Sequence, residues 1–275
     1  MTERYIRLPD SHMHSRFSFD GKHSIKELCA EGLRKNLLAV AITDHCELTV
    51  SGDMTHWSHR DMCLSRMGAR RQKRRMGGKM TVCVGLELGQ PMHNIPQQKD
   101  ILRRGNYDFV LASVHYLRDG RDFYYLNYTD GTSDAHEVYD KYLTELLETA
   151  RDADFDSLAH MTYPLRYIIG RDKVDFDETP YLARYDEILS LLVQRGKALE
   201  INVSGYRREN GFPLPTPDIV RRYKELGGKY ITLGSDTHRI GDLAVGIEEG
   251  AQIARDAGFD RVVYYVGRQP VDVML

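Results

Sequence analysis

The amino-acid sequence predicts an α/β fold in which parallel strands, each followed by a helix, close into a barrel. Short apolar runs alternate with amphipathic stretches along almost the whole chain, which indicates parallel βαβ units. There are seven or eight such units, a number that favours a closed barrel over a doubly wound open sheet. With 275 residues, of which 41% are hydrophobic, the chain is long enough to form one large core.

In the first half of the chain, four apolar runs are expected to form strands, at residues 5–8, 37–43, 80–87 and 107–114. A helix is expected over residues 24–35, because Ser24 and Glu27 can form a capping box and apolar residues recur on one face. Another helix is expected over residues 96–104, which begin with proline and are followed by glycine. Residues 46–79 are more polar than a simple connection, and we expect a helical, basic insertion there.

The second half continues the alternation. Strands are expected at residues 157–159, 198–203, 230–233 and 261–266. Helices are expected at residues 133–150, 179–196, 216–227 and 242–257. Two of these helices begin with Thr-Pro, which places proline in the first turn. Because the sequence contains no flexible linker and no internal repeat, we expect a single domain over residues 1–275.

Composition and charge restrict the class of protein. The formal net charge of −2 and the charged fraction of 28% are ordinary, and they do not point to nucleic acid as a partner. The N-terminal segment has charges and a proline where a signal peptide would be apolar, and no stretch is apolar enough to span a bilayer. We therefore expect a cytoplasmic protein. Its four cysteines form no CxxC pair, which favours free thiols over a zinc ribbon.

Residues that commonly bind metals stand at the ends of nearly all the expected strands. In chain order they are His12, His14, Asp44, His45, Glu87, His115, His160, Asp236 and His238. Glu200 and Asn202 lie within the sixth strand. Because the carboxyl ends of all strands lie on one face of a barrel, these side chains should converge on one cavity. Purely structural residues would instead scatter over both ends of the strands, so the pattern predicts a metal site.

The types of ligand restrict the metal and its chemistry. Imidazole and carboxylate groups without thiolates suit zinc, iron or manganese, and the set is larger than one tetrahedral ion needs. We therefore expect two or three divalent ions, with Glu87 able to bridge a pair. Bridged ions can share a hydroxide nucleophile and stabilise the charge that develops on a phosphoryl group. No G-x-S-x-G, GxxxxGK[ST] or GxGxxG motif accompanies the strands, so neither a serine nucleophile nor a nucleotide-binding loop is supported.

At these residues the sequence resembles the PHP (polymerase and histidinol phosphatase) family. The shared motifs are His12-Met-His14, Thr43-Asp44-His45, Gly85-Leu-Glu87, Ser113-Val-His115, Ala159-His160 and Gly234-Ser-Asp236-Thr-His238. The chain looks most like the monofunctional histidinol-phosphate phosphatases of L-histidine biosynthesis, through residues 20–23 and through residues 199–205 followed by Arg207. The resemblance implies a distorted (βα)7 TIM-like barrel and a metal-dependent phosphomonoester hydrolase acting on histidinol phosphate.

The resemblance also implies a trinuclear site with three sets of ligands. The first ion would be held by His12, His14, Glu87 and Asp236. The second ion would be held by Glu87, His115 and His160. The third ion would be held by Asp20, His45 and His238. Many members of the family have histidine at the position of Asp20, and a carboxylate is a harder ligand, which leaves the identity of the third ion open.

Further residues are expected to act on the substrate. Arg166 and Arg207 follow the fifth and sixth strands and could bind a phosphate dianion through their guanidinium groups, although each could instead pair with a local acid. Glu87 and Asp236 are expected to serve catalysis as well as metal binding. Asp44 is a candidate general acid for the leaving group, provided that burial raises its pKa against the opposing effect of nearby metal ions.

The loop over residues 116–131 has two interpretations. Its acidic and aromatic residues could meet the charged groups of histidinol by ion pairing or cation–π contact; the candidates are Tyr116, Asp119, Tyr124 and Tyr125. Alternatively, the loop is a packed lid with solvated charges.

Two other functions are compatible with the sequence. The first is a PHP phosphoesterase acting on nucleotides or nucleic-acid ends, which is supported only by the basic run Arg70, Arg71, Lys73, Arg74 and Arg75. Such a protein should bind DNA in a salt-dependent manner, whereas the same run could be a solvated helix face. The second is a non-catalytic metal-binding regulatory protein, which would bind metals without turnover.

Overall fold

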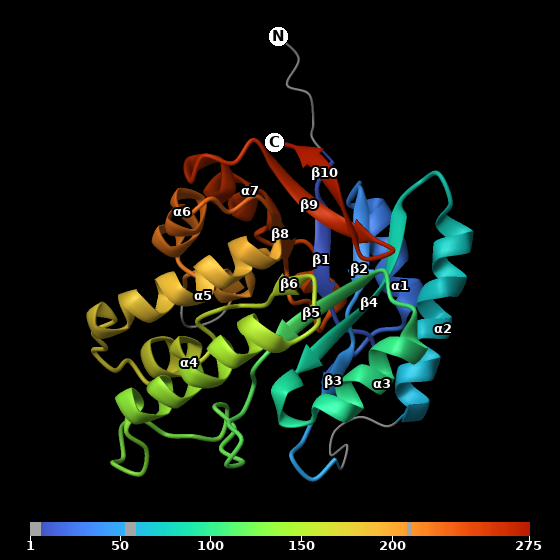
Figure 1. Cartoon of the computed structure of the whole chain (residues 1–275). Coiled ribbons are helices and arrows are strands. Elements are labelled where there is room, and N and C mark those ends of the chain that lie inside the picture. Colours follow the sequence, from blue (N-terminus) through green and yellow to red (C-terminus); the bar gives the residue numbers. More distant parts are fainter. Residues whose placement is uncertain (1–6, 53–58, 208–210) are drawn as a thin grey trace.

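Eight parallel strands form one sheet in the computed structural model, which describes residues 7–52, 59–207 and 211–275 (Figure 1). Seven of them follow the order β1-β2-β4-β5-β6-β7-β8, and the short β3 pairs with β4. The strands are β1 (Pro9–Met13), β2 (Ala39–Ile42), β3 (His45–Glu47), β4 (Thr81–Gly89), β5 (Phe109–Ser113), β6 (Ser157–Leu158), β7 (Ala198–Asn202) and β8 (Ile231–Gly234).

The sheet closes on itself between its first and last strands. Met13 forms a parallel bridge with Thr237, just beyond β8. The His14 N–H donates to the Thr237 carbonyl at 2.8 Å, which strengthens this seam. The expected barrel of seven βα units is therefore confirmed, and the open-sheet alternative is wrong. Closure also brings His12 and His14, near the start of the chain, beside residues that follow β8.

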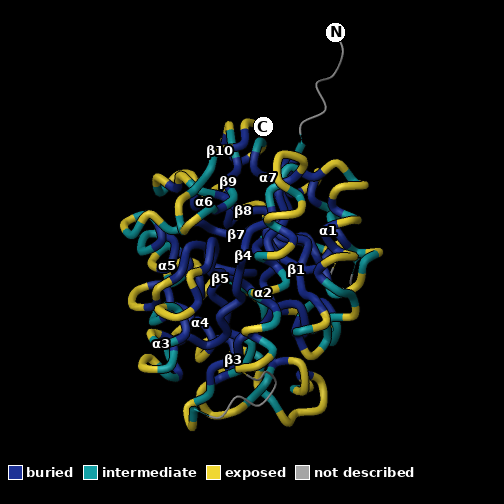
Figure 2. Tube along the Cα trace, turned by 90° about the vertical axis from the view of Figure 1, so that its right-hand side faces the viewer, coloured by how far each residue is buried: buried dark blue, intermediate teal, exposed yellow. Residues whose placement is uncertain are grey.

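Helices cover the outside of the barrel, so that the strands lie in a buried centre (Figures 1 and 2). They are α1 (Ile25–Arg34), α2 (His59–Met76), α3 (Ile95–Gly105), α4 (Ala135–Asp152), α5 (Leu182–Arg195), α6 (Pro217–Glu225) and α7 (Ile247–Asp256). Short turns of helix occur at Pro91–His93, Arg166–Arg171, Thr179–Tyr181, Ser204–Arg207 and Ile240–Asp242. Ser24 and Glu27 form the expected capping box of α1. Gly196 ends α5 with φ 62°, a left-handed conformation that glycine adopts without steric cost.

The last expected strand does not extend the barrel. Instead β9 (Arg261–Val266) pairs antiparallel with β10 (Gln269–Met274), a strand that the sequence analysis missed. Val263 and Tyr265 of β9 pack among side chains of the barrel interior, and the Tyr265 and Phe109 ring centroids are 5.3 Å apart. Asp108, which precedes β5, accepts the Gly267 N–H at 3.0 Å. The hairpin therefore plugs the end of the barrel where the strands begin.

Two other expected boundaries are wrong. The first strand begins at Pro9 and contains Asp10 and His12, because partners elsewhere in the barrel satisfy these polar side chains; Tyr5 and Ile6 lie outside the described residues. The helix expected at residues 242–257 begins only at Ile247, because a short helical turn and Gly246, with φ 89°, come before it.

The segment over residues 46–79 contains β3 and α2, and its residues 53–58 lie outside the described part of the chain. Two residues of its basic run bind the protein itself. Arg70 donates to the Gly105 carbonyl at 3.0 Å, and Lys73 pairs with Asp108 at 2.7 Å. Within the described ranges, none of the helices combines the length and apolar character needed to cross a membrane.

Candidate metal centre

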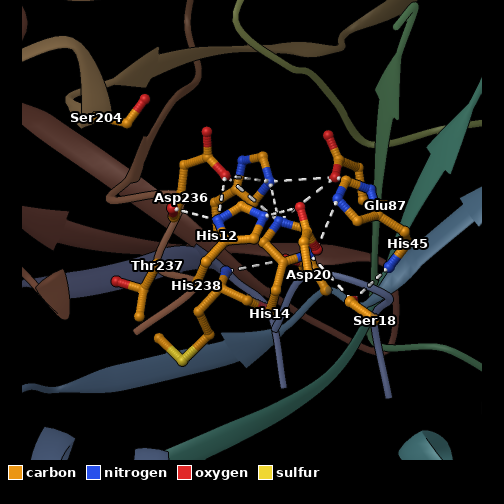
Figure 3. A network of polar contacts seen from close by, with 12 residues as sticks. His12, His14, Ser18, Asp20, His45, Glu87, Ser204, Asp236, Thr237 and His238 are labelled. Carbon is orange, nitrogen blue, oxygen red and sulfur yellow. Dashed lines mark hydrogen bonds and ion pairs between the residues drawn. The ribbon is translucent and has the colours of Figure 1, made fainter. Parts of the chain in front are cut away.

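Four side chains meet where β1, β4 and β8 end (Figure 3). His12 and His14 are alternate residues of an extended segment and point the same way, with their Nε2 atoms 3.0 Å apart. The Glu87 Oε2 atom lies 3.4 Å from His12 Nε2 and 3.5 Å from His14 Nε2. The Asp236 Oδ1 atom lies 3.8 Å and 3.4 Å from the same two nitrogens. All four residues are buried, and their donor atoms are close enough to share one ion.

A second group forms around the other oxygen of Glu87. The Oε1 atom lies 3.0 Å from His160 Nε2 and 3.2 Å from His115 Nε2, and these two nitrogens are 3.4 Å apart. The His45 Nδ1 atom is 2.9 Å from Glu87 Oε2. Glu87 therefore contacts two separate sets of imidazoles, which is the arrangement of a carboxylate that bridges two ions.

A third group lies beside the first. Asp20 Oδ2 is 2.9 Å from His238 Nε2, and Asp20 Oδ1 is 3.7 Å from His45 Nε2. The His14 ring stacks on His45 and on His238 with centroids 4.2 Å away in both cases, so the third group adjoins the first. The structure thus brings together all nine residues expected to bind metal. It differs from the expected sets in one respect, because His45 is within reach of Glu87 and His115 as well as Asp20 and His238.

The donor atoms fit cations better than they fit hydrogen bonding alone. Two pairs of imidazole nitrogens face each other, and the buried atoms His45 Nδ1 and Glu87 Oε2 have no hydrogen-bond partner with suitable geometry among the described residues. A buried polar atom without a partner costs free energy, which a coordinated ion would remove. Imidazole and carboxylate donors without cysteine suit zinc and similar divalent transition metals.

The carboxylates of the centre are held in their ionised form. Burial alone would raise the pKa of Glu87, but the His12, His115 and His45 imidazoles lower it well below its usual range. Burial likewise opposes ionisation of Asp236, yet His12 and other neighbours lower its pKa strongly. The centre therefore offers negative charge to a cation without first having to lose a proton from either group.

Two residues of the centre have unusual backbone conformations. His160 has φ 25° and Asp236 has φ 54°, and neither is glycine. A positive φ at such a residue costs about 1–3 kcal/mol and persists only where the surroundings fix it. Glu200 provides part of that constraint at His160, whose N–H donates to Glu200 Oε2 at 2.9 Å. The other oxygen of Glu200 lies 2.7 Å from His12 Nδ1, which directs His12 Nε2 towards the centre.

Gly234 provides the space that Glu200 and His12 need. A Cβ at this position would lie 2.1 Å from Glu200 Oε1 and 2.6 Å from His12 Cβ. We expect Gly234→Ala to displace both side chains and to weaken metal binding about 10- to 100-fold, as measured by competition with a chelator. Gly241→Ala is the control, because a Cβ there meets nothing within 4 Å. Equal affinity in the two variants would contradict the positioning role of Glu200.

Glu47 belongs to the site, although the sequence analysis missed it. Its Oε1 atom lies 2.9 Å from His115 Nδ1 and 3.0 Å from His45 Nδ1, and its Oε2 accepts from Gln90 Nε2 at 2.7 Å. Glu47 lay in a segment interpreted as an insertion, so no strand end drew attention to it. The signal that could have found it is its spacing, because His45 and Glu47 are alternate residues of an extended segment.

Glu47→Gln should therefore weaken the centre without disturbing the barrel. We expect metal affinity to fall about 10- to 100-fold, because the substitution removes the negative charge that orients His45 and His115. Metal titration against a chelator, with circular dichroism on the same sample, measures both effects. Glu148→Gln, which removes an exposed partner of Arg118, should bind metal as the unmodified protein does. Unchanged affinity after Glu47→Gln would remove Glu47 from the site.

The position of Asp44 contradicts its expected role as general acid. Asp44 is buried and does not line the cavity. Its Oδ1 accepts the Ser15 N–H at 2.6 Å and the Ser18 hydroxyl at 2.8 Å, while its Oδ2 accepts the Ser15 hydroxyl at 2.8 Å and the Ser65 hydroxyl. These contacts fix the segment that leads from β1 to Asp20. We therefore assign Asp44 a positioning role.

Seven of the nine candidate metal ligands, called here the metal-type residues together with His12 and His14, line a cavity of about 450 Å³; they are Asp20, His45, Glu87, His115, His160, Asp236 and His238. Arg166 lies in its wall and is buried, with Nη2 donating to Ser204 Oγ at 2.8 Å and lying 3.2 Å from Asp236 Oδ2. Arg207 lines an adjoining hollow instead, and its guanidinium donates to the Ser235 carbonyl at 2.6 Å and to the Val245 carbonyl at 3.1 Å. Of the two arginines expected to bind phosphate, Arg166 therefore lies in the wall of the cavity that holds the metal-type residues, whereas Arg207 lies in the adjoining hollow.

Comparison with known proteins gives a consistent set of relatives. A probable histidinol-phosphatase of Clostridium acetobutylicum is 30% identical over 93% of this chain and 96% of its own length. A probable histidinol-phosphatase of Thermotoga maritima is 31% identical over 87% of this chain and 88% of its own length. The crystal structure of histidinol phosphate phosphatase from Lactococcus lactis, complexed with zinc, L-histidinol and phosphate, has a TM-score of 0.80 at 23% identity. It covers 96% of this chain and 99% of that one.

The PHP domain matches residues 10–204, which include every residue of the candidate centre except Asp236 and His238. These two residues follow β8 and complete the centre through closure of the barrel. The matched region covers more than half of the chain, and it agrees with the motifs, the barrel and the grouped ligands. The chain therefore belongs to the PHP family.

Proposed function

We propose that this protein is a metal-dependent phosphomonoester hydrolase whose substrate is histidinol phosphate. The single observation that carries the proposal is the position of Glu87, whose two oxygens contact separate groups of imidazoles beside a buried arginine. Relatives named histidinol-phosphatase that align over nearly the whole chain support the choice of substrate.

The chain's own residues would hold two or three divalent ions, with zinc, iron and manganese as candidates. The proposed ligands are the four residues of the first group, Glu87 with His115 and His160, and Asp20 with His45 and His238. When bound, such ions supply Lewis-acid activation of water and neutralise charge on the phosphoryl oxygens. Glu47 contacts His115 Nδ1 and Glu200 contacts His12 Nδ1, so that the Nε2 atom of each ring is directed towards Glu87.

Arg166 would bind and orient the phosphate. Its guanidinium is held 4.8 Å above the Tyr163 ring centroid and against Asp236, so its direction is fixed before the substrate arrives. Because Arg166 lines the cavity, its guanidinium can donate to a phosphate oxygen there. Such a preorganised donor stabilises the charge that develops during phosphoryl transfer. Arg207 would add positive potential from the adjoining hollow.

A substrate screen with metal analysis on the same sample tests this proposal. Histidinol phosphate, nucleoside monophosphates and sugar phosphates are compared by release of inorganic phosphate. We expect the highest kcat/KM for histidinol phosphate, more than one equivalent of transition metal per chain, and loss of activity on chelation that metal restores. Hydrolysis by metal-free protein would overturn the proposed chemistry, and a preference for nucleotides would overturn the proposed substrate.

A further inference from the structure

Exposed aromatic rings gather at the rim of the metal cavity. Phe19 is 57% exposed, Tyr124 is 60% exposed and Tyr125 is 77% exposed, and all three line this cavity. Phe19 stacks on His45 with ring centroids 5.2 Å apart, so the rim is continuous with the metal-type residues. Water-exposed aromatic surface beside a cavity is a mark of ligand contact, because it is costly to leave hydrated.

The loop that carries Tyr124 and Tyr125, between β5 and α4, is held in place from several sides. Arg171 Nη1 donates to the Tyr124 carbonyl at 2.7 Å. The Tyr128 N–H donates to Asp172 Oδ2 at 3.0 Å, and the Tyr116 hydroxyl donates to the Leu48 carbonyl at 2.7 Å. The two exposed rings are therefore presented by a fixed backbone, which reduces the entropy lost when a ligand binds.

Asp122 is the acidic residue that this loop contributes to the cavity wall. The Tyr116–Asp122 antiparallel bridge and the Tyr124 N–H, which donates to Asp122 Oδ1 at 2.8 Å, fix its position. Tyr163 lines the same cavity as Asp122. Tyr163 in turn has its ring centroid 4.8 Å from that of His160. Asp122 and the imidazoles of the metal centre thus share one cavity.

Asp122 is one of five carboxylates that line the cavity. The other four each lie within 3.4 Å of a metal-type imidazole; they are Asp20, Glu47, Glu87 and Asp236. The adjoining hollow is mixed in charge, because Lys22, Arg207 and Arg239 line it together with Asp20, Asp236 and Asp242, and Tyr124 borders it as well. Within the cavity itself, Arg166 lies in the wall beside Asp236, and the loop contributes Asp122 and the exposed aromatic rings.

We propose that Asp122, flanked by Tyr124 and Tyr125, forms a subsite that selects a positively charged organic group on the alcohol side of the phosphate ester. This inference rests on the proposed phosphatase function and assigns residues to recognition of the leaving group. A phosphate dianion is repelled by Asp122 and drawn to Arg166, so the ester binds in one direction. A cationic nitrogen of the alcohol then pairs with the Asp122 carboxylate, and the tyrosine rings contact the cation or a flat heterocycle.

Asp119, the acidic candidate that the sequence offered in this loop, points elsewhere. Asp119 pairs with Arg121 at 2.8 Å and with Lys141 at 3.5 Å, and it does not line the cavity. Asp122 takes the role because the short antiparallel bridge turns the chain back towards the cavity, a feature that no local sequence pattern announces.

Asp122→Asn and Tyr125→Leu test the subsite in the full-length, metal-loaded protein. Asparagine keeps an oxygen acceptor for the Tyr124 N–H, so the loop should retain its shape. We expect KM for histidinol phosphate to rise on the order of tenfold in Asp122→Asn, because a charge-assisted contact is lost. The kcat/KM for 4-nitrophenyl phosphate, whose alcohol carries no positive charge, should change less than about twofold, and Tyr125→Leu should show the same selectivity with a smaller effect.

Asp130→Asn is the matched control, because Asp130 lies in the same loop but does not line the cavity. Equal losses on both esters, or an unchanged KM for histidinol phosphate, would overturn the subsite. Calorimetric binding of L-histidinol separates this inference from the proposed function. Binding that depends on Asp122 in a protein without turnover would support the subsite and reject the phosphatase. If the protein hydrolyses histidinol phosphate but Asp122→Asn binds L-histidinol as tightly as the unmodified protein does, the phosphatase is supported and the subsite is rejected.

Discussion

Replacing Glu87 by glutamine is expected to lower kcat/KM for phosphate esters on the order of 10³-fold and to remove at least about one equivalent of metal. The side chain is buried, and each of its oxygens faces imidazoles of a different group. Glutamine has nearly the same shape, but it lacks the negative charge and replaces one oxygen with an N–H donor that a cation repels. Metal analysis and steady-state kinetics on the same preparation measure the two losses together.

Glu145→Gln is the control for this substitution. Glu145 is also a buried carboxylate beside an imidazole, with Oε2 lying 2.6 Å from His93 Nε2, but it lies outside the metal centre. Its replacement should leave the metal content unchanged. If Glu87→Gln kept its full metal content and activity, Glu87 would not be a ligand and the proposed chemistry would fail with it.

Replacing Arg166 by methionine is expected to lower kcat/KM about 10²- to 10³-fold, roughly 2.7–4 kcal/mol of transition-state stabilisation, while the metal content stays the same. Methionine fills a similar volume over Tyr163, so the loss reports the missing donor and charge. The same variant should bind inorganic phosphate more weakly, which competitive inhibition measures. This separation of activity from metal content distinguishes Arg166 from the ligands.

Arg195→Met provides the comparison for Arg166. The Arg195 guanidinium also lies over an aromatic ring, 5.5 Å from the Phe155 centroid, and donates to backbone carbonyls, but it does not line the cavity. Its replacement should alter stability and leave kcat/KM within about twofold. An Arg166→Met protein with ordinary kinetics would assign phosphate binding to other residues.

The barrel and most of the candidate centre could be predicted because both follow from local periodicity. Alternating apolar runs predict strands and helices, and a polar residue at a strand end has its position set by the barrel itself. For this reason Glu87, His115 and His160 could be placed on one face without coordinates. Neighbouring strands of a parallel sheet turn sequence positions far apart into neighbours in space.

The remaining features depend on contacts that periodicity does not encode. Asp44 shares a motif with His45, yet hydrogen bonds from Ser15, Ser18 and Ser65 hold its carboxylate away from the cavity. Glu47 follows His45 into a short extra strand whose only sheet partner is β4 among the described residues. Asp122 faces the cavity because of a non-local turn. In each case the chemistry of the residue was visible in the sequence, but the direction of its side chain was not.

The packing of Val263 and Tyr265 in the base of the barrel also determines the route by which substrate can enter and products can leave. Because this hairpin fills the base of the barrel, ester and products would enter and leave through the cavity at the opposite end. Under the proposed function, phosphate would bind beside Arg166 and the alcohol would lie nearer to the loop aromatics. We therefore expect the alcohol to depart first and phosphate to depart last, so that accumulated phosphate competes directly with incoming substrate.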